Sequence, residues 1–92
     1  MQVSYSYPPI PGRKFTFTVT AAGPGTVRVF LRDKRLAEWR CKDPPCHEVI
    51  LIPKNALGQV LAFTYQHLSG QIDRFEIPVS SDAATPQGTA YG

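Results

Sequence analysis

The chain has little of several features that define common protein classes. Its 92 residues include one Met, one Trp and two Cys, and ten basic against seven acidic residues leave a formal net charge of only +3. No apolar run approaches the roughly 20 residues of a transmembrane helix, and Met1 is followed by Gln2-Val3-Ser4-Tyr5, unlike the basic and then apolar start of a signal peptide. We therefore expect no membrane insertion and no signal peptide in this chain, and the modest charge argues against a nucleic-acid partner.

Patterns that carry catalysis are also missing from the sequence. His47 and His67 stand outside any nucleophile-elbow setting, and the carboxylates are scattered singly, without the spacing of a glycosidase pair. Gly23-Pro24-Gly25 is typical of a turn and not of a phosphate loop, because Pro24 lacks the backbone N–H that a phosphate would use. The sequence predicts no enzymatic activity and no cofactor.

The residues that are present predict one small folded domain. Hydrophobic residues make up 42% and charged residues 18% of the chain, which is far from the composition of disordered proteins. Nine Pro and seven Gly among many Val, Thr, Tyr and Phe residues favour short strands joined by turns. Residues 81–92 are small, polar and aperiodic, so we expect a domain over residues 1–80 and a flexible C-terminal tail or linker over 81–92.

Alternation of apolar and polar residues predicts the strands. It is clearest in residues 13–20, where Phe15, Phe17 and Val19 alternate with threonines. Similar segments bounded by turn residues give seven expected strands, at 2–7, 13–20, 26–32, 35–41, 49–52, 59–67 and 71–80. Pro78 in the last segment indicates an edge strand or the end of pairing. This spacing predicts an all-β fold, an antiparallel two-sheet β-sandwich of immunoglobulin-like layout.

Residues 33–40 allow two interpretations. A turn at Asp33-Lys34 would return the chain as the second strand of a hairpin. Alternatively, Asp33 caps a short helix in which Leu36 and Trp39 lie three residues apart. We expect the hairpin and keep the helix as the alternative.

The strand layout resembles immunoglobulin-like and fibronectin type III-like β-sandwich modules. Residues 27–36, VRVFLRDKRL, are similar to the C–C′ hairpin of these modules. The chain departs from the immunoglobulin pattern because Phe17 and either Ala62 or Phe63 stand where the inter-sheet cysteine pair would lie, and strand C has no Trp. The resemblance implies the architecture and a tendency toward extracellular modular proteins.

Two cysteines flank a bend at Asp43-Pro44-Pro45. Cys41 and Cys46 are five residues apart, a spacing that can bring their Cα atoms within disulfide range. We expect a disulfide, which would stabilise the fold by about 2 kcal/mol and imply a secreted, cell-surface or virion location. The alternative is a metal site formed by Cys41, Cys46, His47 and His67, a donor set that zinc accepts, although its spacing matches no zinc-finger template.

Basic and aromatic residues concentrate in the segment after residue 27. The candidate partner-binding residues are Arg28, Phe30, Arg32, Arg35, Trp39 and Arg40. If Trp39 emerged beside the arginines, this patch would offer a stacking platform within positive charge. The simpler interpretation is that the basic side chains cover a solvent-exposed face, with Asp33 and Glu38 as partners, while Trp39 caps the core.

The sequence therefore favours a non-catalytic interaction or spacer module of a larger secreted, cell-surface or virion protein, monomeric as an isolated domain. Its expected partner is a protein, bound through loops or the basic C–C′ face. One alternative is a carbohydrate-binding module that uses Trp39, Tyr5, Tyr7 or Tyr65 as sugar platforms. The other is the metal-binding module described above.

Overall fold

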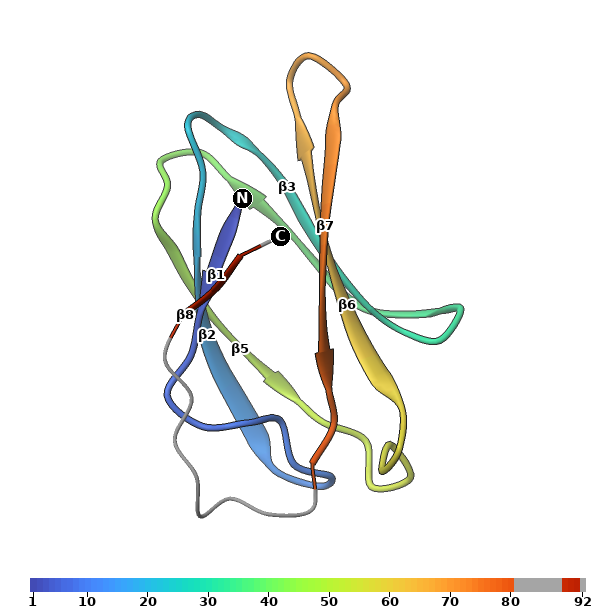
Figure 1. The fold of residues 1–92 in the computed structure, drawn as a ribbon. Helices are drawn as coiled ribbons and strands as arrows, with labels where there is room; N and C mark the ends of the chain where they lie inside the picture. Colours follow the sequence, from blue (N-terminus) through green and yellow to red (C-terminus); the bar gives the residue numbers. More distant parts are fainter. Residues whose placement is uncertain (81–88, 92) are drawn as a thin grey trace.

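Two antiparallel sheets form the molecule. The computed structural model describes residues 1–80 and 89–91, with side chains only for the first range. The strands are β1 (Gln2–Ser4), β2 (Lys14–Thr20), β3 (Gly25–Leu31), β4 (Lys34–Cys41), β5 (Cys46–Leu51), β6 (Val60–His67), β7 (Ile72–Pro78) and β8 (Thr89–Tyr91). They pair in the orders β5-β2-β1-β8 and β4-β3-β6-β7 (Figure 1). The predicted all-β, two-sheet antiparallel sandwich is confirmed, and the described residues contain no helix.

The segment with two interpretations is a hairpin. β4 pairs antiparallel with β3, so the capped-helix alternative is wrong. The turn places Arg32 at a φ of 55°, a left-handed conformation that residues other than glycine rarely adopt. The β3–β4 register also shifts between Val29 and Phe30, since Val29 pairs with Ala37 but Phe30 pairs with Arg35. Leu36 is thus the extra residue of a β-bulge.

Two strand boundaries differ by three residues from those expected, and the other boundaries of these strands agree to within two residues. β1 ends at Ser4 and not at residue 7. Continuing its register with β2 would bring Pro8 opposite Lys14, and proline has no N–H to pair. β5 begins at Cys46, ahead of the expected start at residue 49. The prediction began too late because Glu48 interrupts the apolar pattern, yet Glu48 is part of the strand and pairs opposite Phe17.

The expected C-terminal tail lies largely outside the described residues. Residues 81–88 and 92 are not among them. Thr89–Tyr91 form β8, which pairs antiparallel with β1.

The hydrophobic core lies between the two sheets. Residues that alternate with exposed positions on each sheet fill it, each at most 7% exposed, and the strands supply Val3, Phe15, Phe17, Val19, Val27, Val29, Leu31, Cys41, Ile50, Leu61, Phe63, Tyr65 and Ile77. The rings of Phe17 and Phe63 meet edge to face with centroids 5.0 Å apart, which joins β2 of one sheet to β6 of the other. Each buried aromatic of this kind contributes roughly 1.5–3 kcal/mol to folding.

Tyr65 also fixes the turn between β2 and β3. Its hydroxyl donates a 2.6 Å hydrogen bond to the carbonyl oxygen of Gly23, and its ring is fully buried. A Cβ on Gly25 would collide with this ring and lie 2.6 Å from the carbonyl oxygen of Gln66. The predicted turn at residues 23–25 therefore needs a glycine at position 25. Burial also raises the pKa of the Tyr65 hydroxyl.

Candidate functional site

The outer side of the β3–β4 hairpin carries most of the predicted binding residues. We call its outward-facing side chains, Arg28, Phe30, Arg35, Glu38 and Arg40, the arginine face. They face outward because they pair across the hairpin in the rows that alternate with the buried valines of β3. Phe30 is half-buried and lies opposite Arg35, so an aromatic ring stands among the guanidinium groups.

Hydrogen bonds hold part of the arginine face in place. Arg28 donates from Nε to Oε1 of Glu38 at 2.6 Å and from a terminal nitrogen to Oε1 of Gln66 at 2.8 Å. Arg35 donates to the same Glu38 oxygen at 3.0 Å. The hydrogen bond from Arg28, reinforced by the nearby charges of Arg28 and Arg35, lowers the pKa of Glu38. One carboxylate thus serves two arginines, and the face keeps a positive charge.

The sheet adds two residues that the sequence analysis missed. Arg28 pairs with Thr64 of β6, and Thr64 pairs with Arg74 of β7, so Arg74 lies in the same outward row. Arg74 donates a 2.8 Å hydrogen bond to Glu76. The two missed residues, Arg74 and Glu76, alternate with Phe75 and Ile77, and this alternation marks them as outward residues. Only strand pairing shows that they share a sheet with the hairpin.

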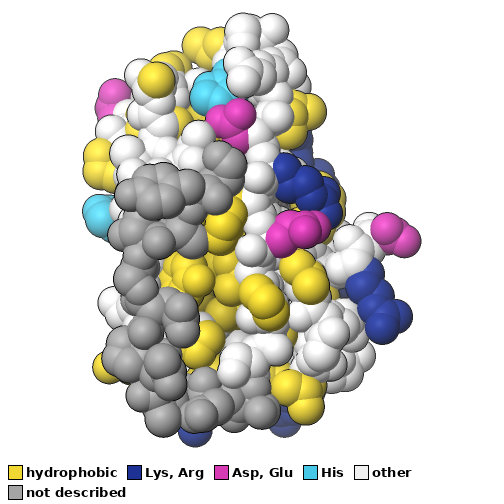
Figure 2. Space-filling view, in the orientation of Figure 1, with side chains coloured by type: hydrophobic (Ala, Val, Ile, Leu, Met, Phe, Trp, Pro, Cys, Tyr) yellow, Lys and Arg dark blue, Asp and Glu magenta, His cyan; other side chains and the backbone are white. Residues whose placement is uncertain are grey.

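A shallow hollow opens at the lower end of this sheet. Its volume is about 280 Å³, and its lining residues are Arg32, Gly58, Gln59, Val60, Ala62, Arg74 and Glu76. Figure 2 shows basic and acidic side chains next to each other on the side of the molecule that carries β7. Arg32 therefore belongs to the edge of this hollow, between the hairpin turn and β7, and it is exposed.

Trp39 does not lie on the arginine face. It pairs opposite Val27, a fully buried residue, so its side chain is on the inner side of β4. Its ring packs against Phe17 with centroids 5.8 Å apart. Trp39 therefore caps the core, as in the simpler interpretation, and forms no stacking platform beside the arginines, because the alternation along β4 turns Trp39 inward while Glu38 and Arg40 point outward.

The aromatic residues considered for sugar binding occupy different environments. Tyr65 is fully buried and Trp39 is half-buried against the core. Tyr5 is also half-buried, with its ring centroid 5.6 Å from that of Phe15. Tyr7 is 59% exposed. Among these four residues, only Tyr7 presents most of its surface to solvent.

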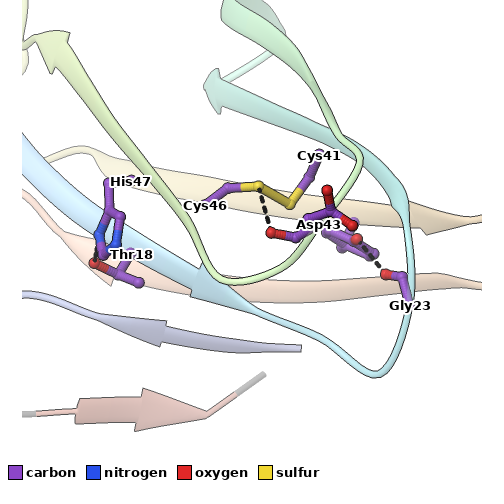
Figure 3. The surroundings of a disulfide bond; sticks show 7 residues. Thr18, Gly23, Cys41, Asp43, Cys46 and His47 are labelled. Carbon is purple, nitrogen blue, oxygen red and sulfur yellow. Dashed lines mark hydrogen bonds between the residues drawn. A yellow bond between two sulfur atoms is a disulfide. The ribbon is translucent and has the colours of Figure 1, made fainter.

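The two cysteines form the expected disulfide. The sulfur atoms of Cys41 and Cys46 are 2.06 Å apart and the Cα atoms 6.1 Å apart, and the bridge joins the end of β4 to the start of β5 (Figure 3). The sulfurs are therefore unavailable as zinc ligands. His47 of β5 lies by Thr18, with Nδ1 2.8 Å from Oγ1, and His67 of β6 lies on the other sheet, beside Asp73. Residues 1–80 contain no group of three or more His, Cys, Asp or Glu side chains placed to hold a metal ion, so the metal alternative loses its donor set.

A second polar cluster ties the first strand to the opposite sheet. Asp73 Oδ2 accepts from the Met1 amino group at 2.9 Å and lies 2.8 Å from Nε2 of His67. The hydrogen bond from His67, followed by that from the Met1 amino group, lowers the pKa of Asp73. The His67 ring also meets Tyr65 edge to face, with centroids 4.9 Å apart. This cluster is a structural tie between the layers.

A comparison with protein-family models, curated proteins and solved structures finds no match to this chain. In the described ranges there is also no helix with the length and hydropathy needed to cross a lipid bilayer.

Proposed function

We propose that the protein is a non-catalytic interaction module, of the immunoglobulin-like or fibronectin type III-like class, that binds an acidic protein surface through the arginine face. The distribution of strands supports the class. One sheet holds β1, β2, β5 and β8 and the other holds β3, β4, β6 and β7. Apart from the added β8, this matches the division into strands A, B and E and strands C, C′, F and G of such modules.

The observation that carries the proposal is that three arginines share the outward side of the β3–β4 hairpin with Phe30. Arg28, Arg35 and Arg40 project from two paired strands, and a single carboxylate, Glu38, is bonded to the first two. Arginine and aromatic side chains contribute most to protein interfaces, and the planar guanidinium matches a carboxylate in geometry. A face of this composition fits a partner that presents Asp or Glu side chains.

The hollow beside the arginine face supports the same partner chemistry. Arg32 and Arg74 line it together with Ala62, which is 4% exposed. A carboxylate entering the hollow would meet the Arg32 guanidinium and would compete with Glu76, a lining residue whose carboxylate already pairs with Arg74. The partner side chain that we place there is Asp or Glu.

The disulfide supports an extracellular, cell-surface or virion location for the module. Disulfides persist in oxidising compartments and are rare where thiol systems keep cysteines reduced. The loop closed by Cys41 and Cys46 is on the surface. In protein purified without reductant from its native source, both cysteines should resist alkylation until a reductant is added.

Charge reversal on the arginine face tests the proposal. The probe is a fluorescein-labelled decapeptide of alternating Glu and Tyr, titrated at 50 mM and at 200 mM salt. The variant Arg35→Glu/Arg40→Glu should weaken binding about ten-fold or more at the lower salt concentration, because two ion pairs become repulsions. The Tm should change little, since both side chains are exposed.

The matched control is Lys42→Glu/Lys54→Glu, which changes the net charge equally at exposed positions outside the arginine face. It should retain most of the binding. Equal losses in the two double variants would contradict the proposal, since binding would then follow net charge and not the arginine face.

A further inference from the structure

β2 has a sheet partner along only part of one side. It pairs with β5 from Lys14 to Val19, but its pairing with β1 covers only Thr18 to Thr20. Beyond Ser4 the chain turns away from β2 before it returns to start that strand (Figure 1). Residues 14–17 therefore face a gap in the sheet.

Backbone hydrogen-bonding groups point into this gap. The carbonyl oxygen of Arg13 accepts a 2.9 Å hydrogen bond from the N–H of Ile52, which follows β5, so the backbone C=O of Arg13 points to the β5 side of β2. In an antiparallel strand, successive residues point their N–H and C=O groups to opposite sides. Lys14 and Thr16 therefore direct theirs away from β5, and within residues 1–80 no backbone hydrogen bond joins them to residues 5–8.

The gap is wide enough for a ligand. It forms a cleft of about 430 Å³ lined by residues 4–8 on one side and 14–18 on the other, a volume in the range of ligand-binding sites. Tyr5 and Tyr7 contribute aromatic surface, and Lys14 is the one charged residue in the lining. The site thus combines free backbone donors and acceptors with apolar surface and one positive charge.

Three of the edge strands, β4, β5 and β7, are less suited to accept a strand. β4 carries the bulge at Leu36, and β7 ends in Pro78. β5 has Glu48 on the inner side, opposite Phe17. Bulges, prolines and inward-pointing charges are the features that block strand addition at an edge. Residues 14–17 contain no bulge, proline or inward-pointing charge, and their one charged side chain, Lys14, is exposed.

We infer that this cleft binds an extended acidic peptide as an added β-strand, between β2 and residues 5–8. The peptide backbone would pair with the N–H and C=O groups of Lys14 and Thr16, as in other cases of strand addition. A peptide carboxylate would meet the Lys14 ammonium group. This site is separate from the arginine face and does not depend on it.

The test measures binding of the full chain to a synthetic fluorescein-labelled hexapeptide, Thr-Val-Glu-Val-Thr-Glu, whose ends are blocked. We expect saturable binding and slower amide hydrogen exchange at Lys14 and Thr16 in the complex. Every second peptide amide would point toward β2. N-methylation of these amides should weaken binding about ten-fold, since it removes the two hydrogen bonds that they donate to the carbonyl oxygens of Lys14 and Thr16. N-methylation of the other set should have little effect, because those amides point away from β2.

Three variants locate the site. Lys14→Glu should weaken binding of the hexapeptide about five-fold or more, whereas the matched Lys42→Glu should not, and Arg35→Glu/Arg40→Glu should leave most of it intact. The inference is overturned if the hexapeptide does not bind, if both methylated peptides bind alike, or if binding is lost with the arginine-face variant and kept in Lys14→Glu. Failure of the arginine-face experiment described above would leave these outcomes unchanged.

Discussion

The two ends of the sandwich are held together by different kinds of bond. The disulfide end consists of the turns at residues 21–24, 42–45 and 68–71, and the proline end consists of the loops at 5–13 and 52–59 (Figure 1). Side chains connect the elements at the disulfide end: the Cys41–Cys46 bridge, the Tyr65 hydroxyl on Gly23, and Asp73 between His67 and the Met1 amino group.

The proline end is held mainly by the backbone. The N–H of Gly12 donates to the carbonyl oxygen of Ile52 at 2.8 Å, and that of Val79 donates to the carbonyl oxygen of Gln59 at 2.9 Å. The N–H of Ser80 donates to Pro9 in the same way at 2.9 Å. Backbone hydrogen bonds persist through most side-chain changes, so we expect the loss of a hydrogen-bonding or disulfide side chain to cost more at the disulfide end.

The largest effect is expected at Gly25. Gly25→Ala would place a methyl group against the Tyr65 ring and the Gln66 carbonyl oxygen, and such overpacking should lower the free energy of unfolding by about 3 kcal/mol. Urea denaturation measures the change. Gly23→Ala is the matched control, because no atom lies within 4 Å of its added Cβ. A similar small loss in both variants would show that the Tyr65 tie is looser than described.

Removal of the disulfide should have the next largest effect. Cys41→Ala/Cys46→Ser should reduce the free energy of unfolding by about 2 kcal/mol, because the open loop gains entropy in the unfolded chain. Alanine is chosen at position 41 since Cys41 is only 1% exposed and a hydroxyl there would be buried. Reducing the native protein should give a similar loss under urea. A loss below about 0.5 kcal/mol in both measurements would mean that the backbone alone holds this end.

The smallest effect, and the one that depends on pH, is expected at Asp73. Its pKa is lowered in the folded state, so the ionised carboxylate stabilises the fold above the unfolded-state pKa of about 3.9. That contribution disappears as the pH falls through the lower, folded-state pKa. Asp73→Asn should therefore cost at most about 1 kcal/mol near pH 6 and nothing at the most acidic pH at which the fold persists.

Urea denaturation of both proteins across this pH range gives the measurement. Gln59→Ala, at the proline end, removes one exposed side-chain hydrogen bond to the Asn55 carbonyl oxygen and should show a small cost that does not change with pH. A pH-independent loss in Asp73→Asn would contradict the assigned role of its charge.

The strands could be predicted from the sequence because one face of each is buried. Phe15, Phe17 and Val19 alternate with threonines, and this period of two places them in the core whatever the partner strand is. The end of β1 was harder to predict, since it depends on which residues of β2 a longer β1 would have faced, and thus on the register between two segments.

The candidate site was only partly predictable. Arg28, Arg35 and Arg40 do share an outward face, but Trp39 points inward. The bulge at Leu36 explains the difficulty: it changes the alternation within β4, so Arg35 and Glu38 face the same way although they are three residues apart. Arg74 joins this sheet through two strand pairings that no local pattern contains.

The pairing of β8 with β1 has a mechanical consequence. Gln2 lies opposite Tyr91 and Ser4 opposite Thr89, so the first residue of β1 and the last residue of β8 are side by side. A pulling force applied to the chain at residues 2 and 91 would load their pairs one after another, as in opening a zipper, and not all together in shear. Under tension the molecule would therefore lengthen first by peeling β8 from β1, at low force, while the β2–β5 pairing and the core stayed intact.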